Sequence, residues 1–280
     1  MTARPHPRRP DGPPTAAFVG ELQRRVQVPG VMLADVRDDP RVPVGRHTHA
    51  EAQFCVLLSD GYRSSARDAP YACGRGTLLY HPAGTTHDDR YLRRGGRFLT
   101  VTANPGAGGG LAKLPALPSA SCAFVGPRTE ILCEKLALES GRQDASAPLA
   151  LECLVLEMVG LVVSEPPERR CPSWLRRVLE RVLEQPDSPT VAELAAEAGV
   201  HPVSLARAFR RHVGMTPGEV RRWARLRRVL PALSGRSDSL ARLALEAGFS
   251  DQTSFTRACR RVLGVPPGRY RAWTRSTSRG

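Results

Sequence analysis

Three of the seven histidines, His47, His49 and His87, have side chains that can bind a metal or a small ligand. Alternate residues of a β-strand point to the same side, so His47, His49, Glu51 and Gln53 can all face one pocket. Imidazole nitrogens with a carboxylate or amide oxygen suit Zn, Fe, Ni or Mn. A divalent metal is therefore one predicted cofactor. The alternative is a small-molecule effector held by the same histidines.

A second group of residues recurs in the last hundred positions of the chain. The segment Leu194–Gly199 returns as Leu243–Gly248, with Leu-Ala and Glu-Ala-Gly at matching places 49 residues apart. A few residues later, the same arginine triplet occurs in both copies at an offset of 50. The triplets are Arg207, Arg210 and Arg211, and then Arg257, Arg260 and Arg261. A repeat at this spacing predicts two copies of one small structural unit.

Each copy has the pattern of two short helices separated by a glycine. Apolar residues at helical spacing end at Gly199 in the first copy and at Gly248 in the second, where a positive φ is expected. A second helix is predicted over 202–212 and over 251–262, with one apolar side and one arginine-rich side. A helix, a glycine turn and a second helix with a basic face are typical of a helix-turn-helix that enters the DNA major groove.

The charge of the chain supports a polyanionic partner. The chain has 41 Lys+Arg against 27 Asp+Glu, and residues 172–280 alone contain 20 basic and 9 acidic residues. Double-stranded DNA is the predicted partner. The seven cysteines show no Cys-x-x-Cys spacing, which excludes a zinc ribbon and indicates reduced thiols in a cytoplasmic protein. The apolar stretch 149–163 contains two glutamates, so no membrane segment is expected.

The distribution of apolar, charged and turn-forming residues divides the chain into four parts. Residues 1–17 are Pro- and Arg-rich and predict a disordered tail. Residues 18–105 contain short apolar runs between turn residues, which favour a β-sandwich or barrel. After a Gly/Pro/Ala linker at 104–118, residues 119–165 predict two helices that pack either on the β-domain or on a second subunit. We assign them as a helical dimerisation segment, with a homodimer as the candidate assembly. Residues 172–280 form the fourth, helical part.

Residues 174–273 resemble the C-terminal region of AraC/XylS-type transcriptional regulators. The similarity is most specific over 240–255 and 264–271. It implies two helix-turn-helix subdomains joined by a helix over 223–233. Two residues depart from the family pattern: Cys259 stands where a Phe matching Phe209 is usual, which predicts a smaller second core, and Pro231 is expected to bend or shorten the joining helix.

The resemblance also implies which side chains contact DNA. Arginine can form a forked pair with guanine and glutamine with adenine, whereas other arginines hold phosphates and set the register. The implied base contacts are Val203, Ser204, Ala206, Arg207, Gln252, Thr253, Thr256 and Arg257. The implied phosphate contacts are Arg210, Arg211, Arg260 and Arg261.

The first domain resembles the cupins. His47-x-His49 is similar to their first motif, and Gly76-x5-Pro82-x-Gly84-x2-His87 is similar to their second. The resemblance covers about residues 31–102 and implies a barrel whose interior takes a ligand. Gln53 stands at the position where metal-bearing members have a carboxylate.

These features predict an α+β protein with an N-terminal cupin-like β-barrel, a helical linker and a C-terminal all-α domain with two helix-turn-helix subdomains. The expected function is sequence-specific transcriptional regulation, controlled by a small molecule or metal, without enzymatic activity. RNA polymerase would be a further partner of an activator. Two alternatives stay open: a metal-dependent cupin enzyme that carries a basic helical domain, and a non-specific DNA-compacting protein.

Overall fold

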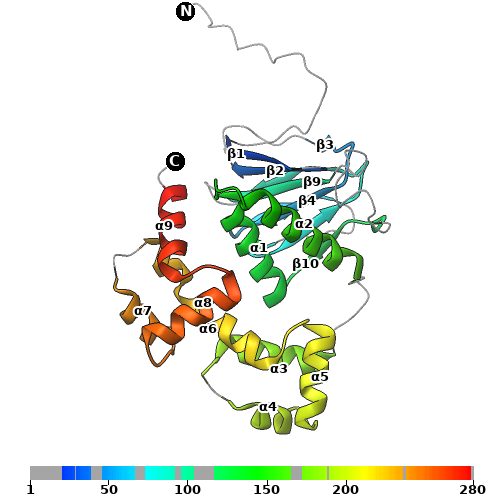
Figure 1. Cartoon of the computed structure of the whole chain (residues 1–280). Helices are drawn as coiled ribbons and strands as arrows, with labels where there is room; N and C mark the ends of the chain where they lie inside the picture. The colour runs from blue at the N-terminus through cyan, green and yellow to red at the C-terminus, as the bar shows by residue number, and fades with distance from the viewer. Residues whose placement is uncertain are drawn as a thin grey trace, which may run out of the picture.

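The N-terminal half is built on one antiparallel sheet with two small strand pairs beside it (Figure 1). The computed structural model describes residues 21–28, 30–38, 46–66, 73–91, 96–103, 117–164, 172–187, 189–235 and 238–278. The predicted tail 1–17 and most of the predicted linker 104–118 lie outside these ranges. The six-stranded sheet has the order β1-β2-β9-β4-β6-β10. Its strands are β1 (Glu21–Val28), β2 (Val31–Arg37), β4 (Gln53–Leu57), β6 (Leu78–His81), β9 (Arg97–Ala103) and β10 (Cys122–Phe124).

The small pairs lie against one face of this sheet. Strand β3 (His47–Thr48) pairs with β7 (Thr86–His87), and β5 (Tyr62–Ser64) pairs with β8 (Asp89–Tyr91). Tyr62 and Tyr91 pack on Cys55, Leu57 and Leu79 of the large sheet. The three ladders stay separate among the described residues, so the expected closed barrel is replaced there by an open sheet with two short flanking pairs.

Two helices cover the other face of the sheet. The alternate residues Phe54 and Val56 point to this side and pack in one core with α1 (Pro127–Ser140) and α2 (Ala147–Ser164). These bounds confirm the two predicted helices. Helix α2 has a mean hydropathy of 1.9 and is long and apolar enough to cross a membrane, but 39% of it is buried inside the protein. Its apolar composition is thus explained in part by packing on the sheet.

The C-terminal half is entirely helical in the described residues. Its helices are α3 (Ser173–Glu184), α4 (Val191–Glu197), α5 (Pro202–His212), α6 (Pro217–Gly235), α7 (Leu240–Glu246), α8 (Gln252–Leu263) and α9 (Pro267–Ser278). Gly199 and Gly248 have φ values of 65° and 77°, as the helix-turn-helix pattern predicts. Side-chain caps fix the helix starts, because Thr190 and Glu193 form a capping box on α4 and Asp251 caps α8.

The two departures from the family pattern have structural outcomes. Pro231 does not end the joining helix, because α6 continues past it to Gly235. The helix also begins at Pro217, well before the predicted start. Cys259 is fully buried, and the second core gains an aromatic ring from Phe249, whose centroid lies 5.6 Å from that of Phe255. The first repeat has Val200 at the position of Phe249. The second repeat thus has an aromatic ring at Phe249, whereas the first has one at Phe209, and the Phe249 ring offsets the small side chain of Cys259.

Candidate functional site

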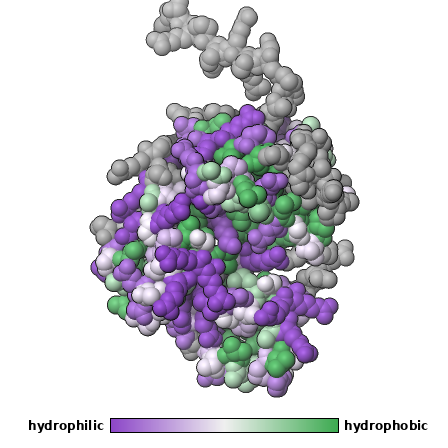
Figure 2. All heavy atoms as spheres, in the orientation of Figure 1, coloured by the Kyte–Doolittle hydropathy of each residue, from purple (hydrophilic) through white to green (hydrophobic). Residues whose placement is uncertain are grey.

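The recognition helices α5 and α8 present the predicted contact residues to solvent. Val203 is 50% exposed, and Ser204, Arg207, Gln252, Thr253 and Arg257 are also exposed, whereas Ala206 and Thr256 are intermediate. The opposite sides of both helices are buried through Leu205 and Phe209 and through Phe255 and Cys259. Hydrophilic residues cover much of the helical half on the face shown in Figure 2, with apolar patches between them. Both helices therefore have one packed side and one free polar side.

The arginines of these two faces differ from several arginines elsewhere in the helical half. Among the described residues, no ion pair is formed by Arg207, Arg210, Arg211, Arg257, Arg260 or Arg261, all of which are exposed. In contrast, Arg225 and Arg228 of α6 both pair with Asp187, and Arg242 of α7 pairs with Glu246. Six exposed arginines, none of them in an ion pair among the described residues, form on two helix faces a surface suited to phosphates and base edges.

Three predicted histidines meet in the N-terminal domain. His47 and His87 are direct partners across β3 and β7, and the ring centroids of His47, His49 and His87 lie 4.5 to 5.0 Å apart. Their ligand nitrogens fall within 4.8 Å of one another, and the Nε2 atoms of His47 and His49 are 3.0 Å apart. The three imidazoles can share one small ligand.

The other two predicted pocket residues have different places. Gln53 is buried at the start of β4, where its main chain pairs with His81 of β6. Glu51 is exposed and is not one of the groups whose ligand atoms converge in the described residues. Residues 49–52 are not in a strand, so their side chains do not alternate between two sides as predicted. The predicted reason for placing Glu51 beside the histidines therefore does not apply.

The structure adds His81 and Asp89, which the sequence pattern did not single out. His81 lies 4.6 Å from His87 between ring centroids, and its Nδ1 is 3.1 Å from Ser121 Oγ. Asp89 Oδ2 lies 2.8 Å from His87 Nδ1 and accepts a hydrogen bond from the Tyr62 hydroxyl. Two features of the sequence could have indicated these residues. Asp89 lies two residues after His87, and His81 lies next to Pro82 in the cupin-like motif.

The electrostatic environment favours the neutral form of His49 and His81. Burial, followed by the neighbouring histidines, lowers the pKa of His49 to about 4. Burial, followed by His87, lowers the pKa of His81 to about 4 as well. Burial opposes ionisation of Asp89, but contact with His87 and the hydrogen bond from Tyr62 outweigh it, so the pKa of Asp89 lies below its usual value. Imidazole nitrogens beside an ionised carboxylate form a donor set for a divalent cation.

Two buried nitrogens have no protein partner. The Nε2 atoms of His81 and His87 make no hydrogen bond among the described residues, and both side chains are almost fully buried. Unpaired buried nitrogens are costly unless a ligand satisfies them. The contacts of Ser121 and Asp89 to the Nδ1 atoms leave each Nε2 free to coordinate, as in metal sites where an outer residue orients each histidine. The residues present therefore fit a divalent transition metal.

Comparisons with known proteins match the helical half. Residues 194–272 match the family model described as a helix-turn-helix domain. No curated protein matches the sequence. An AraC-type transcriptional regulator from Chromobacterium violaceum has 24% identity and a TM-score of 0.34, with 36% of this chain and 91% of that chain covered. The DNA-binding domain of AdpA, solved with a target DNA, has 28% identity and a TM-score of 0.34, covering 37% and 94%.

One further solved structure is similar to part of this chain. An oxalate decarboxylase from Lactobacillus farciminis has 25% identity and a TM-score of 0.23, with 27% of this chain and 24% of that chain covered. At these TM-scores the solved structures add no weight to the family match. The match itself covers both repeats, from α4 to α9. Residues 194–272 are thus a helix-turn-helix domain of the AraC/XylS type.

Proposed function

We propose that this protein is a sequence-specific DNA-binding transcriptional regulator that acts in the cytoplasm. The observation that carries the proposal is the pair of exposed recognition faces, on which six arginines have no ion pair among the described residues. Phosphate contacts alone would not need the different side chains of the two faces, such as Gln252, Thr253 and Val203. This variety favours sequence reading over DNA compaction. A regulator that activates transcription would also contact RNA polymerase.

The test is selection of preferred duplexes by the full chain from a random DNA pool. We expect one sequence class to be enriched and bound much more tightly than random duplex at physiological salt. Arg207→Ala should weaken binding to that sequence, whereas Arg242→Ala is the matched control, because Arg242 lies on α7 and pairs with Glu246. Equal affinity for every duplex would contradict sequence-specific regulation and support a compacting protein.

We also propose that the histidine cluster holds a divalent transition metal and that the metal controls the regulator. The support is the convergence of His47, His49 and His87, together with the unpartnered Nε2 atoms of His81 and His87. The metal would be held by the three predicted histidines, with His81 and Asp89 beside them. The same centre would serve the alternative of a metal-dependent enzyme, but the second recognition helix and its arginine triplet favour regulation.

Metal content of the full chain separates these possibilities. Elemental analysis after removal of loosely bound ions should find about one metal per wild-type chain and none in His49→Ala. His201→Ala is the control, because His201 caps α5 in the helical half. A wild-type chain without metal would contradict the metal proposal and leave a small organic molecule as the effector.

Dimerisation through residues 119–165 stays a prediction. Leu149 of α2 is 65% exposed, and Cys153, one helical turn later, is exposed as well. Both residues would be covered if α2 packed against a second copy. Leu149→Glu should then convert a dimer into a monomer in analytical ultracentrifugation, and a monomeric wild-type chain would contradict the prediction.

A further inference from the structure

Two acidic residues of α1, one helical turn apart, link the N-terminal domain to the helical half. Glu134 is 5% exposed, and its two carboxylate oxygens have different partners. Oε1 accepts a hydrogen bond from Arg75 Nε at 3.2 Å, and Oε2 accepts one from the Tyr270 hydroxyl at 3.0 Å. Arg75 belongs to the turn before β6, and Tyr270 belongs to α9. One buried carboxylate therefore connects the sheet to the last helix of the second repeat.

The partners of Glu134 are themselves held in place. Arg75 also donates to the carbonyl oxygen of Leu58 at 3.0 Å, so its guanidinium is fixed against the sheet. Tyr270 is buried, and burial followed by the charge of Glu134 raises the pKa of its hydroxyl well above the usual value. The hydroxyl thus remains a donor at all relevant pH values. A buried carboxylate that loses one of these partners becomes strongly unfavourable.

Glu130 makes the corresponding contacts with α6. Its Oε2 accepts a hydrogen bond from Trp223 Nε1 at 2.9 Å, and its Oε1 lies 3.3 Å from Arg227 Nη1. Helix α6 joins the two repeats, so Glu130 holds the joining element while Glu134 holds the last helix. Gly76 permits this arrangement, because a Cβ there would lie 2.6 Å from Glu130 Cγ.

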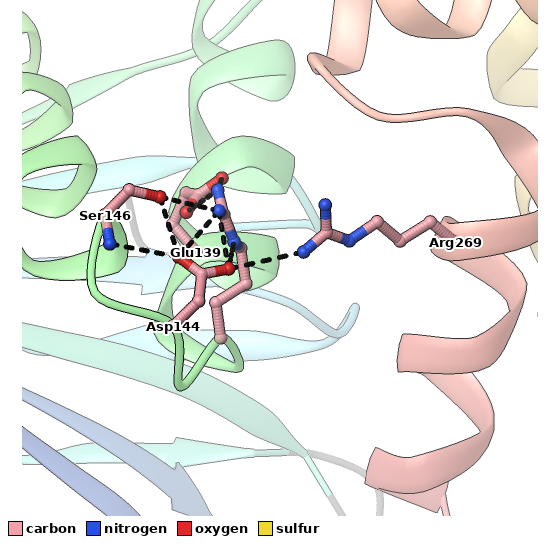
Figure 3. A network of polar contacts seen from close by, with 5 residues as sticks. Glu139, Asp144, Ser146 and Arg269 are labelled. Atoms are coloured by element: carbon pink, nitrogen blue, oxygen red, sulfur yellow. Dashed lines mark hydrogen bonds and ion pairs between the residues drawn. The ribbon is translucent and has the colours of Figure 1, made fainter.

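Further contacts join the second repeat to the N-terminal domain. Figure 3 shows Arg269 of α9 pointing toward Asp144 in the turn after α1, with an ion pair at 3.4 Å. The Trp273 ring of α9 lies 5.8 Å from the Arg97 guanidinium of β9. Leu138 of α1 belongs to the apolar core of the second repeat. The second repeat is thus docked on the N-terminal domain from several sides.

The first repeat meets α1 differently: a Cβ at Gly214, in the turn after α5, would lie 2.9 Å from Arg128 Cδ of α1. The core of the first repeat is a separate cluster that α3 completes through Leu175, Val178 and Val182. The two recognition helices therefore have different attachments: α5 is packed on α3, whereas α8 belongs to a core that includes α1. A movement of α1 can therefore act on the second repeat through its core, whereas α1 meets the first repeat only at the turn after α5 in the described residues.

The interface around the acidic pair is incompletely packed. A cavity of about 530 Å³ lies between the domains, with Asp60, Arg75, Glu130, Glu134, Trp223 and Arg227 among its lining residues. Directed polar contacts hold this part of the interface, and Leu138 and Ile131 of α1 pack in the apolar core of the second repeat.

We propose that Glu130 and Glu134 form a latch through which the N-terminal domain sets the orientation of the second recognition helix. The recognition faces of α5 and α8 remain exposed in the latched arrangement. The latch therefore does not block DNA; it fixes the geometry in which both helices can bind the same duplex. Release of the latch lowers DNA affinity, because the orientation must then be recovered on binding. This inference rests on the proposed DNA-binding function.

The experiment uses the full chain and the duplex that the wild type selects from a random pool. Arg75→Gln removes the sheet-side partner, Tyr270→Phe removes one hydroxyl on the other side, and Arg25→Gln on the exposed side of β1 is the control. Each latch variant should bind the duplex about 5- to 10-fold more weakly, and the double variant should lose no more than either single one, because both act through Glu134. Hydrogen exchange without DNA should become faster in α9 for both latch variants but not for Arg25→Gln.

Each measurement has a result that would contradict the proposed latch. Wild-type affinity in Arg75→Gln with unchanged exchange in α9 would show that the sheet does not hold the second repeat. Multiplied losses in the double variant would show that the two residues act separately. If the wild type selects no duplex, the proposed function fails, yet the exchange measurement still decides whether the latch exists. Tyr270→Phe keeps the ring and guards against a result caused by misfolding.

Discussion

Arg257 and Arg260 lie on one face of α8, and the proposed function assigns a base contact to Arg257 and a phosphate contact to Arg260. Both side chains are exposed, and neither has an ion pair among the described residues, so their removal leaves no acidic group without its partner. Alanine is also a good helix former, and the free energy of unfolding should change by no more than about 0.5 kcal/mol. A change in DNA affinity therefore reports the DNA contact itself.

The two substitutions should differ in sequence dependence and in salt dependence. Arg257→Ala should cost roughly 1 to 3 kcal/mol on the selected duplex, or about 5- to 150-fold in affinity, and much less on a duplex already altered at the base that Arg257 reads. Arg260→Ala should weaken every duplex by the same factor. The loss of one phosphate contact lowers the salt slope by about 0.9, so the deficit should shrink about 3.5-fold between roughly 50 and 200 mM salt.

The assay is a binding titration of both variants on a panel of single-base-pair variants of the selected duplex at several salt concentrations. A uniform loss for Arg257→Ala across the panel would refute its role in base reading. A new order of sequence preference in Arg260→Ala would refute its assignment to phosphate. Unchanged affinity in both variants would remove α8 from the DNA interface altogether.

Three further substitutions test the site and the packing. Asp89→Asn should weaken metal binding about 10- to 100-fold in a chelator competition, because Asp89 orients His87, and unchanged affinity would remove that role. Gly76→Ala should lower the free energy of unfolding by about 1 to 3 kcal/mol in denaturant titration. This loss of stability should be larger than that caused by Gly84→Ala, because both glycines have positive φ but only Gly76 lies close to another segment. Equal losses in the two variants would exclude the close approach of Gly76 to Glu130. Cys259→Phe should cost about 1 to 3 kcal/mol through overpacking, and a neutral result would reveal unfilled space in the second core.

The helical half could be predicted closely because its signals are local. Gly199 and Gly248 mark turns that need positive φ, and the bounds of α5 equal those expected from the apolar spacing. The exposed side of each recognition helix follows from the same spacing, since a helix that buries Phe209 or Phe255 must turn the residues opposite them to solvent. Neither result depends on how distant parts of the chain meet.

The histidine cluster and the latch depend on distant parts of the chain. His81 joins the cluster only because β6 pairs with β4 and brings it beside Gln53, a pairing that strand parity does not reveal. Glu130 and Glu134 have the spacing of an ordinary solvated helix face. Their partners Trp223 and Tyr270 are 93 and 136 residues away. Sequence patterns identify the residue types, but tertiary pairing decides which of them meet.

The different attachments of the two repeats determine where a signal from the N-terminal domain can act. The repeats have the same arginine triplets, but α3 completes the core of the first repeat, whereas Leu138 of α1 contributes to that of the second. A metal or effector that moves α1 should therefore change DNA contacts made by α8 more than those made by α5, which α1 meets only through the turn at Gly214 in the described residues. Base preference at the position read by Arg257 should depend on the effector more strongly than preference at the position read by Arg207. Equal effects at both positions would require a signal that passes through α6 to the whole helical half.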